Sequence, residues 1–414
     1  MTTLIRNIRQ LFQVRRESPL LRGAALSELP MLEDAWILLE DGIIAAYGTA
    51  ADMPASLATV EDQVDAAGGA VLPAWCDSHT HIVFDGSRET EFVDKIRGLS
   101  YAEIAARGGG ILQSARRLNE ASEDSLFRQA WARLEEVSRQ GTGAIEIKSG
   151  YGLTVEGELK MLRVIRRLRN LSPLTIKATF LGAHTYPLEY RDNHAEYIRM
   201  IREEMLPVIA REKLADYIDV FCEEGFFSPA ETEEICRAGM AVGLKPKIHA
   251  NQMNLSGGTQ AGVKLGAVSV DHLETMDASA ISALAGSDTI GTLLPTAAFF
   301  LRMPFQPARQ LIDAGAAIAL ASDYNPGSSP SGNMNLVVSM ACIQMKMLPE
   351  EAVNAATLNG AHAMELGDSL GSITAGKKAN LVLTRPIPSL AYLPYAFGTS
   401  QIRGIILGKH RMEI

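Results

Sequence analysis

Cysteine is scarce in this sequence, with four residues among 414. The four lie far apart and form no Cys-x-x-Cys pair: Cys76, Cys222, Cys236 and Cys342. This distribution excludes a disulfide framework and a cysteine-ligated zinc knuckle. It predicts reduced thiols in a cytoplasmic protein.

Long runs of like charge and long apolar runs are missing as well. The net charge is −9 and no extended basic segment occurs, which argues against nucleic acid as a partner. The arginines near the N-terminus enclose no apolar core, so no secretory signal is predicted. The uncharged stretch 324–345 approaches the length of a membrane span, but Pro326, Pro330 and several Ser, Asn and Gly residues argue against one. Hydrophobic residues at 47% and charged residues at 21% instead indicate a soluble globular protein with no membrane partner.

The two ends of the chain resemble each other. Residues 1–70 contain strand-like pieces on either side of the turn signal Asp41-Gly42, and residues 367–414 contain strand-like pieces punctuated by glycine. The simplest arrangement pairs both ends in one small β-sandwich domain.

The middle of the chain, residues 71–366, alternates strand-like and helix-like segments. Eight strands are predicted, centred on 71–75, 144–147, 176–180, 218–221, 245–248, 267–270, 289–293 and 318–321. Eight alternating units predict an α/β fold, a (β/α)8 barrel, for this part of the chain.

Ionisable side chains cluster where these strands end. His79 and His81 follow strand one, and alternate residues of a strand point to the same side, so the pair makes half of a metal site. The ends of later strands carry five more such side chains: Lys148, His184, His249, His272 and Asp323. One histidine at a strand end is more often structural, but five of the eight histidines share this face. Since barrel active sites lie at the C-terminal ends of the strands, this face is the predicted active site.

Eight segments spread in order along the barrel resemble the amidohydrolase superfamily and, within it, the family of imidazolonepropionases, enzymes of histidine degradation. They are Asp77–Phe84, Gly108–Ile111, Lys148–Leu153, Thr179–His184, Asp219–Glu223, Ile248–Gln252, Asp271–Glu274 and Ser322–Pro330. The His-x-His pair marks the superfamily, whereas Lys-Ser-Gly-Tyr-Gly-Leu and Asp-Tyr-Asn-Pro-Gly-Ser-Ser are specific to the family.

The resemblance implies a hydrolase that opens the cyclic amide of the small molecule 4-imidazolone-5-propanoate, giving N-formimino-L-glutamate. It implies one Zn²⁺ or Fe ion per subunit, with four ligands: His79, His81, His249 and Asp323. Such an ion polarises a carbonyl and lowers the pKa of its water to roughly 7. By the same resemblance, Asp323 also takes the proton of the water, and His272 orients or stabilises the carbonyl oxygen. Taken alone, Asp323 has the alternative role of capping a helix after strand eight.

The absence of a bridging lysine predicts one metal ion rather than two. Binuclear relatives bridge two ions with a carboxylated lysine on strand four, and strand four has no lysine here. Lys148 is predicted on strand two, where it is poorly placed to bridge, although a second ion through Lys148 stays an alternative.

Substrate-binding residues are also implied by the resemblance. Arg88 is assigned to the propanoate, because a guanidinium pairs with a carboxylate at two points. His184 is counted with the catalytic residues and hydrogen-bonds the ring or its carbonyl. The other binding residues are Tyr151, in a Gly-Tyr-Gly turn that is expected to be flexible, and Gln252, Asn325, Gly327 and Ser328. Taken alone, Arg88 resembles a surface arginine, and residues 325–328 resemble a plain loop.

Two positions depart from the family pattern. Asn251 stands where relatives commonly have Asp, and Gln252 stands where some have Glu. Because Gln252 cannot carry a proton, the role of general base is assigned to Asp323 and His272.

Gln252 also disfavours the alternative of a cytosine- or guanine-type deaminase, which needs Glu at this position. A third hypothesis, a non-catalytic barrel scaffold, is disfavoured because all four ligands are intact. The resemblance also suggests a homodimer.

Overall fold

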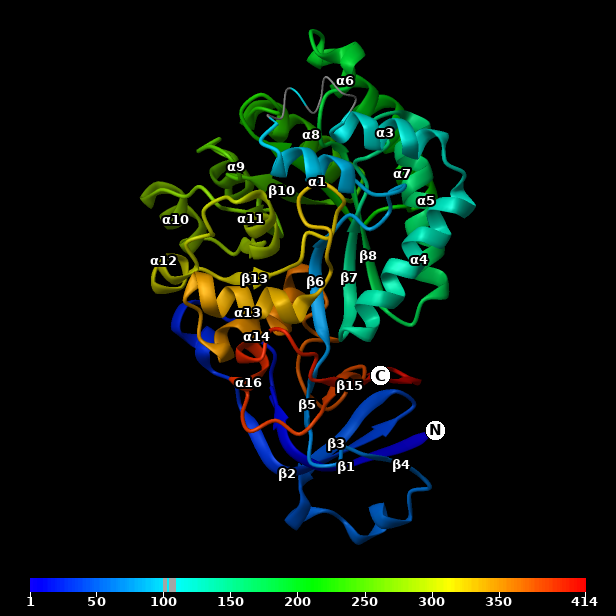
Figure 1. Cartoon of the computed structure of the whole chain (residues 1–414), viewed down its shortest axis with the longest axis vertical. Helices are drawn as coiled ribbons and strands as arrows, with labels where there is room; N and C mark the ends of the chain where they lie inside the picture. The colour runs from blue at the N-terminus through cyan, green and yellow to red at the C-terminus, as the bar shows by residue number, and fades with distance from the viewer. Residues whose placement is uncertain (100–102, 104–108) are drawn as a thin grey trace.

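The computed structural model describes residues 1–99, 103 and 109–414, so Gly108 of the predicted glycine motif lies outside the described residues. A parallel sheet surrounded by helices fills the upper part of Figure 1, and a second sheet with both chain termini lies below it. No helix within the described ranges is long and apolar enough to cross a membrane.

The parallel sheet forms the (β/α)8 barrel that the sequence predicts. Its eight strands pair in sequence order: β6 (Trp75–Thr80), β7 (Thr142–Lys148), β8 (Thr175–Ala183), β9 (Tyr217–Cys222), β10 (Lys245–Ala250), β11 (Ser269–His272), β12 (Ile290–Leu293) and β13 (Ile318–Leu320). Nearly every residue of these strands is buried, as in parallel sheets covered on both faces. Double burial explains the apolar residues on both faces of these strands, although several strands also carry buried polar or charged residues.

Helices connect the strands and cover the barrel. Those between strands are α1 (Glu89–Ile96), α3 (Ile111–Glu120), α4 (Glu123–Arg139), α5 (Val155–Leu171), α6 (His194–Met200), α7 (Leu206–Glu212), α8 (Pro229–Ala241), α9 (Gly258–Leu265), α10 (Ala278–Ala285), α11 (Pro295–Leu301) and α12 (Ala308–Asp313). After β13 come α13 (Met334–Met345), α14 (Pro349–Ala356), α15 (Leu358–Ala363) and the short α16 (Tyr392–Tyr395).

Local sequence signals fix where several of these helices begin. Ser228 and Glu231 form a reciprocal capping box at the start of α8, with Pro229 in the first turn. The Thr154 hydroxyl accepts the amide of Gly157 at the start of α5. These caps fix the points at which α5 and α8 begin, shortly after the ends of β7 and β9.

The second sheet joins the two ends of the chain, as predicted for the small β domain. Its strands are β1 (Thr2–Phe12), β2 (Met31–Glu40), β3 (Ile43–Thr49), β4 (Asp62–Asp65), β5 (Ala70–Pro73), β14 (Asn380–Thr384), β15 (Ile402–Leu407) and β16 (His410–Glu413). They pair in the order β16-β15-β14-β5-β1-β2-β3, and β4 also pairs with β1. Apolar residues of this sheet, including Ile5, Ile37 and Leu381, form a buried cluster of their own.

The prediction of one barrel strand at residues 71–75 is wrong. Residues 70–73 form β5, which pairs with β1 and β14 of the small sheet. The first barrel strand is β6, which begins at Trp75 and contains His79. Because β5 and β6 are both fully buried, hydrophobicity does not separate them in the sequence.

The barrel closes between β6 and the segment after β13. The amide of Asp323 donates to the carbonyl of His79 at 3.0 Å, and the amide of His81 donates to the carbonyl of Tyr324 at 2.9 Å. The Asp77 carboxylate reinforces this seam by accepting the amide of Ser322 at 3.0 Å and its hydroxyl at 2.6 Å. Closure therefore brings Asp323 beside the His79–His81 pair.

Candidate metal centre and active site

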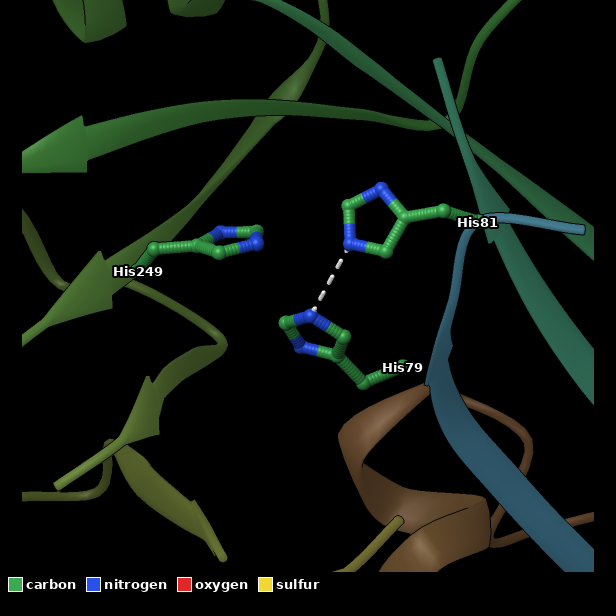
Figure 2. Close-up of side chains that lie close together, drawn as sticks. All are labelled: His79, His81 and His249. Atoms are coloured by element: carbon green, nitrogen blue, oxygen red, sulfur yellow. Dashed lines mark hydrogen bonds between the residues drawn. The ribbon is translucent and has the colours of Figure 1, made fainter. Parts of the chain in front are cut away.

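Three imidazoles and one carboxylate converge at the mouth of the barrel. Figure 2 shows His79 and His81, from the first strand and its end, and His249, from β10, pointing toward one another. The Nε2 atoms of His79 and His81 are 3.3 Å apart, and each lies 3.5 Å from Asp323 Oδ1. Tetrahedral ligands at about 2.0–2.1 Å from a zinc ion have donor atoms about 3.3 Å apart, so this spacing fits a metal ion.

The state of the histidines also fits a metal. Burial, together with the nearby Lys148 and neighbouring imidazoles, lowers the pKa of His79, His81 and His249 well below the usual histidine value. Neutral imidazoles offer the lone pairs that metals require. His249 Nε2 is buried without a hydrogen-bond partner among the described residues. A buried polar atom of this kind is costly unless a ligand satisfies it.

Asp323 is held by the turn that follows it. Its Oδ2 accepts the Ser328 hydroxyl at 3.1 Å, and the Asn325 amide donates to the Asp323 carbonyl at 2.6 Å. Asn325 Oδ1 accepts the backbone amides of Gly327 and Ser328, both at 2.8 Å. Burial raises the pKa of Asp323 to about 6 in the metal-free protein. Asn333, rather than Asp323, caps the next helix, α13.

His272 lies close enough to His79 and Asp323 to share a metal-sized cluster with them. Its Nδ1 is 3.4 Å from Glu274 Oε1, which also accepts the Gln306 amide at 2.9 Å. Burial opposes the charged form of His272, but the carboxylates of Glu274, Asp323 and Asp271 together outweigh burial and raise the pKa of this imidazole. His272 is therefore the histidine of this cluster best suited to carry a proton.

His184, one residue beyond β8, is fixed in a defined tautomer. Its Nδ1 is 3.0 Å from the carbonyl of Gly150, which can only accept, so Nδ1 carries the proton. Burial lowers the pKa of His184 to about 4, so the ring is neutral. Nε2 is consequently a hydrogen-bond acceptor.

The Gly-Tyr-Gly turn is not the flexible frame expected from its glycines. Glu158 of α5 accepts the amides of Gly150, Gly152 and Leu153 at 3.0, 2.7 and 3.0 Å. A Cβ on Gly152 would lie 2.2 Å from the backbone nitrogen of Glu158, so glycine here permits close packing against α5. The turn holds Tyr151 in a buried position beside His81 and His184.

Arg88 is tied to a neighbouring carboxylate. Its Nη2 and Nε donate to Glu91 Oε2 at 2.6 and 3.0 Å, and Glu91 Oε1 accepts the amide of Gly110. A Cβ on Gly327 would lie 2.4 Å from Arg88 Nη1, so the guanidinium packs directly on that glycine. Lys95 adds a second cation, with Nζ 3.3 Å from the carbonyl of Gly327.

One cavity of about 290 Å³ gathers these groups. It is lined by all the site residues predicted from the sequence except His79, which is fully buried beside it. Gln252 lines the cavity, whereas the Asn251 side chain donates to the carbonyl of Thr275 at 3.0 Å and shapes the adjoining loop.

Sequence reasoning gave no role to several charged residues of this region. They are Glu91, Lys95, Glu146, Asp219, Lys247, Asp271 and Glu274. A usable signal was present for some of them, because Glu146 and Lys148, and likewise Lys247 and His249, are each separated by one apolar residue at the end of a predicted strand.

Comparison with known proteins shows that the chain is similar to hydrolases of the amidohydrolase family. Residues 226–409 match the model of the amidohydrolase family. An imidazolonepropionase of Flavobacterium johnsoniae is 57% identical over 408 residues, which cover 98% of this chain and 99% of the relative. An imidazolonepropionase of Thermoanaerobacter pseudethanolicus is 39% identical over 406 residues, covering 98% and 96%.

Solved structures with the same fold are more distant in sequence. Escherichia coli guanine deaminase superposes with a TM-score of 0.76 at 13% identity, covering 100% of this chain and 99% of that one. An adenosine deaminase from Xanthomonas campestris, solved with bound zinc, gives a TM-score of 0.69 at 18% identity, covering 100% and 93%. At these identities the likeness concerns the fold alone.

Proposed function

The chain belongs to the imidazolonepropionases of the amidohydrolase family, and we propose that it uses one bound metal ion to hydrolyse the cyclic amide of 4-imidazolone-5-propanoate. The observation that carries this proposal is the convergence of His79, His81, His249 and Asp323 on a cavity that Arg88 also lines. The product is N-formimino-L-glutamate.

The four donors would hold the ion as a Zn²⁺ or Fe site. A metal bound there would polarise the substrate carbonyl and lower the pKa of a water molecule to roughly 7. A single ion is supported by the state of Lys148. Although burial opposes its charge, Asp219, Glu146 and Asp271 raise the pKa of Lys148, whereas bridging two metals requires a neutral amine that can be carboxylated.

Residues of the chain itself carry out the proton transfers. In the proposed reaction, water adds to the carbonyl carbon and the ring carbon–nitrogen bond breaks. Asp323 is placed to accept the proton of the attacking water and to pass a proton to the leaving ring nitrogen. His272, with its raised pKa, is placed to donate to the carbonyl oxygen as charge develops there.

The cavity walls orient the substrate. Arg88 would pair with the propanoate beside Asn325, Gly327 and Ser328. Because His184 Nε2 is an acceptor, its role is to accept the ring N–H of the substrate, not to donate to the carbonyl. Tyr151 and Gln252 complete the binding surface.

The other hypotheses receive less support. The similar deaminases are distant in sequence, and Gln252 offers no proton shuttle. A non-catalytic scaffold would not need intact ligands around a cavity. A cytoplasmic homodimer in the histidine-degradation pathway stays a prediction that rests on the resemblance.

The test is anaerobic incubation of metal-loaded protein with freshly prepared 4-imidazolone-5-propanoate, following loss of its ultraviolet absorbance and identifying the product by mass spectrometry. We expect N-formimino-L-glutamate, with drastically lower turnover in a folded Asp323→Asn variant. No turnover by the loaded parent, or ammonia release from guanine or cytosine instead, would refute the proposal.

A further inference from the structure

A cluster of charged side chains fills the barrel directly beneath the candidate metal ligands. Its members come from β7, β9, β10 and β11 and are all fully buried: Glu146, Lys148, Asp219, Lys247 and Asp271. Barrel interiors are usually packed with branched apolar side chains, so a charged layer at this depth is unusual. The proton-transfer roles proposed above do not use any of these residues.

Two carboxylates of the cluster touch the metal-binding histidines. Asp271 Oδ2 lies 2.7 Å from His79 Nδ1, and its Oδ1 accepts the Ser269 hydroxyl at 2.5 Å. Asp219 Oδ2 lies 3.0 Å from His249 Nδ1, a contact within ion-pair distance but not aligned as a hydrogen bond. Asp219 Oδ1 also accepts the backbone amide of His249 at 3.2 Å. A carboxylate next to Nδ1 keeps the proton there and leaves Nε2 free for a metal.

One ammonium group joins these carboxylates. Lys148 Nζ is 2.8 Å from Asp219 Oδ2 and 3.4 Å from Asp271 Oδ2, and it is held in place by Glu146 Oε1 at 2.6 Å. The same Asp219 and Asp271 oxygen atoms face the two imidazoles. Without the ammonium, two buried carboxylates would repel each other at the point where both must hold a ligand.

We infer that Lys148 is a positioning residue for the metal centre. Through Asp271 and Asp219, it fixes the orientation and tautomer of His79 and His249, and so sets the affinity of the site for its ion. This role rests on the proposed metal-dependent function, but it concerns metal binding and not the chemical step. The better-aligned link, from Asp271 to His79, carries the larger share.

Lys247 provides a matched control. It is equally buried and pairs with Glu146 of the same cluster, but its charge acts on Asp219 and Asp271 only at longer range, since no hydrogen bond or ion pair joins it to either in the described part of the chain. A cluster that only fills the barrel would respond alike to the loss of either lysine.

The test measures the Zn²⁺ dissociation constant of metal-free protein by competition with a chelator, in the parent and in Lys148→Met, Lys247→Met, Asp271→Asn and Asp219→Asn. We expect Lys148→Met and Asp271→Asn to weaken binding about 10- to 100-fold, as for other groups that orient metal ligands. Asp219→Asn should have a smaller effect, and Lys247→Met should stay within about threefold, even if both lysine variants lower the thermal midpoint equally. If Lys148→Met does not fold, the comparison rests on Asp271→Asn, which keeps the volume of the side chain.

Equal losses in the two lysine variants, or unchanged affinity in Asp271→Asn, would overturn the inference. The parent protein separates this outcome from failure of the proposed function. A parent that binds zinc but does not open the imidazolone ring contradicts the function alone, whereas an active parent whose variants retain full zinc affinity contradicts the positioning role alone.

Discussion

Asp323 and His272 face the substrate cavity from backbone that few residues other than glycine adopt. Their φ angles are 52° and 86°. Such conformations cost on the order of 1–3 kcal/mol and concentrate at functional sites. Here the strained backbone lies where the chain leaves β11 and β13, and it brings both side chains close to His79, one of the proposed metal ligands.

The raised pKa of Asp323 predicts how metal affinity depends on pH. Burial raises this pKa to about 6, whereas the pKa values of His79, His81 and His249 are lowered well below the usual histidine value. Above about pH 6 the carboxylate is ionised and affinity should be nearly constant. Below it, one proton must leave before the metal binds, so affinity should fall about tenfold per pH unit.

Chelator competition at pH values between 5 and 8 measures this dependence. The Asp323→Asn variant, which lacks the titrating group, should bind more weakly and without the break near pH 6. A steeper fall, with two or more protons displaced per metal, would mean that the histidines titrate instead.

Arg88 and Gly327 should act as one unit in recognising the propanoate. Arg88→Lys should lower kcat/KM about ten- to a hundredfold, because lysine lacks the planar fork and a charge-assisted contact contributes about 1.5–3 kcal/mol. Gly327→Ala should raise KM in the same way, since the new methyl group would lie 2.4 Å from Arg88 Nη1.

Steady-state kinetics with metal content measured alongside checks both variants. Gly398→Ala is the control, because a Cβ at Gly398 meets nothing within 4 Å. An imidazolone without the propanoate should react equally poorly with parent and variants. Activity of Arg88→Ala within about twofold of the parent would instead identify Arg88 as an ordinary surface residue.

Much of the residue pattern is readable from the sequence, because strand-end spacing brings distant histidines to one face of a barrel. The sequence says less about which residue performs which role. Asp271 contacts His79 across the closed barrel, Asp219 contacts His249 through the pairing of β9 with β10, and nothing local in the sequence marks those contacts. Arg88 and Glu91 are neighbours in sequence, but the choice of Glu91 as the partner of Arg88 depends on the position of helix α1.

At the scale of single elements, the buried Glu158 carboxylate holds the turn between β7 and α5 by accepting three of its backbone amides. Glu158→Gln keeps the size of this side chain but replaces one accepting oxygen with an NH2 group that faces backbone donors. We expect a loss of about 1–3 kcal/mol in the free energy of unfolding, as for other unsatisfied buried groups, and a raised KM because Tyr151 is released.

Denaturant unfolding and substrate kinetics measure these two effects. Glu156→Gln, on the exposed side of the same helix turn, should change neither. If Glu158→Gln matches the parent in both stability and KM, the turn does not depend on this carboxylate.

Element boundaries mark the limit of the sequence prediction. The barrel strands and the joining of the two chain ends follow from their patterns, whereas the division between β5 and β6 does not, because strands buried in two different sheets look alike. Pairing with β1 and β14 assigns residues 70–73 to the small sheet, and we propose that the catalytic part begins at β6.

For the whole molecule, closure of the barrel completes the candidate metal centre, because it brings Asp323 beside His79 and His81. The backbone bonds that join Asp323 to His79 and His81 to Tyr324 lie at the seam between the first and last strands. The four proposed ligands extend from residue 79 to residue 323 of the sequence, and the seam brings Asp323 Oδ1 to 3.5 Å from the Nε2 atoms of His79 and His81.

The central claim, hydrolysis that depends on a single metal ion, is tested most directly by adding Zn²⁺ or Fe²⁺ in increments to metal-free protein under anaerobic conditions. Turnover of 4-imidazolone-5-propanoate should rise in proportion to added metal and level off at one equivalent per chain. Full activity without metal, or a rise that continues to two equivalents, would contradict it.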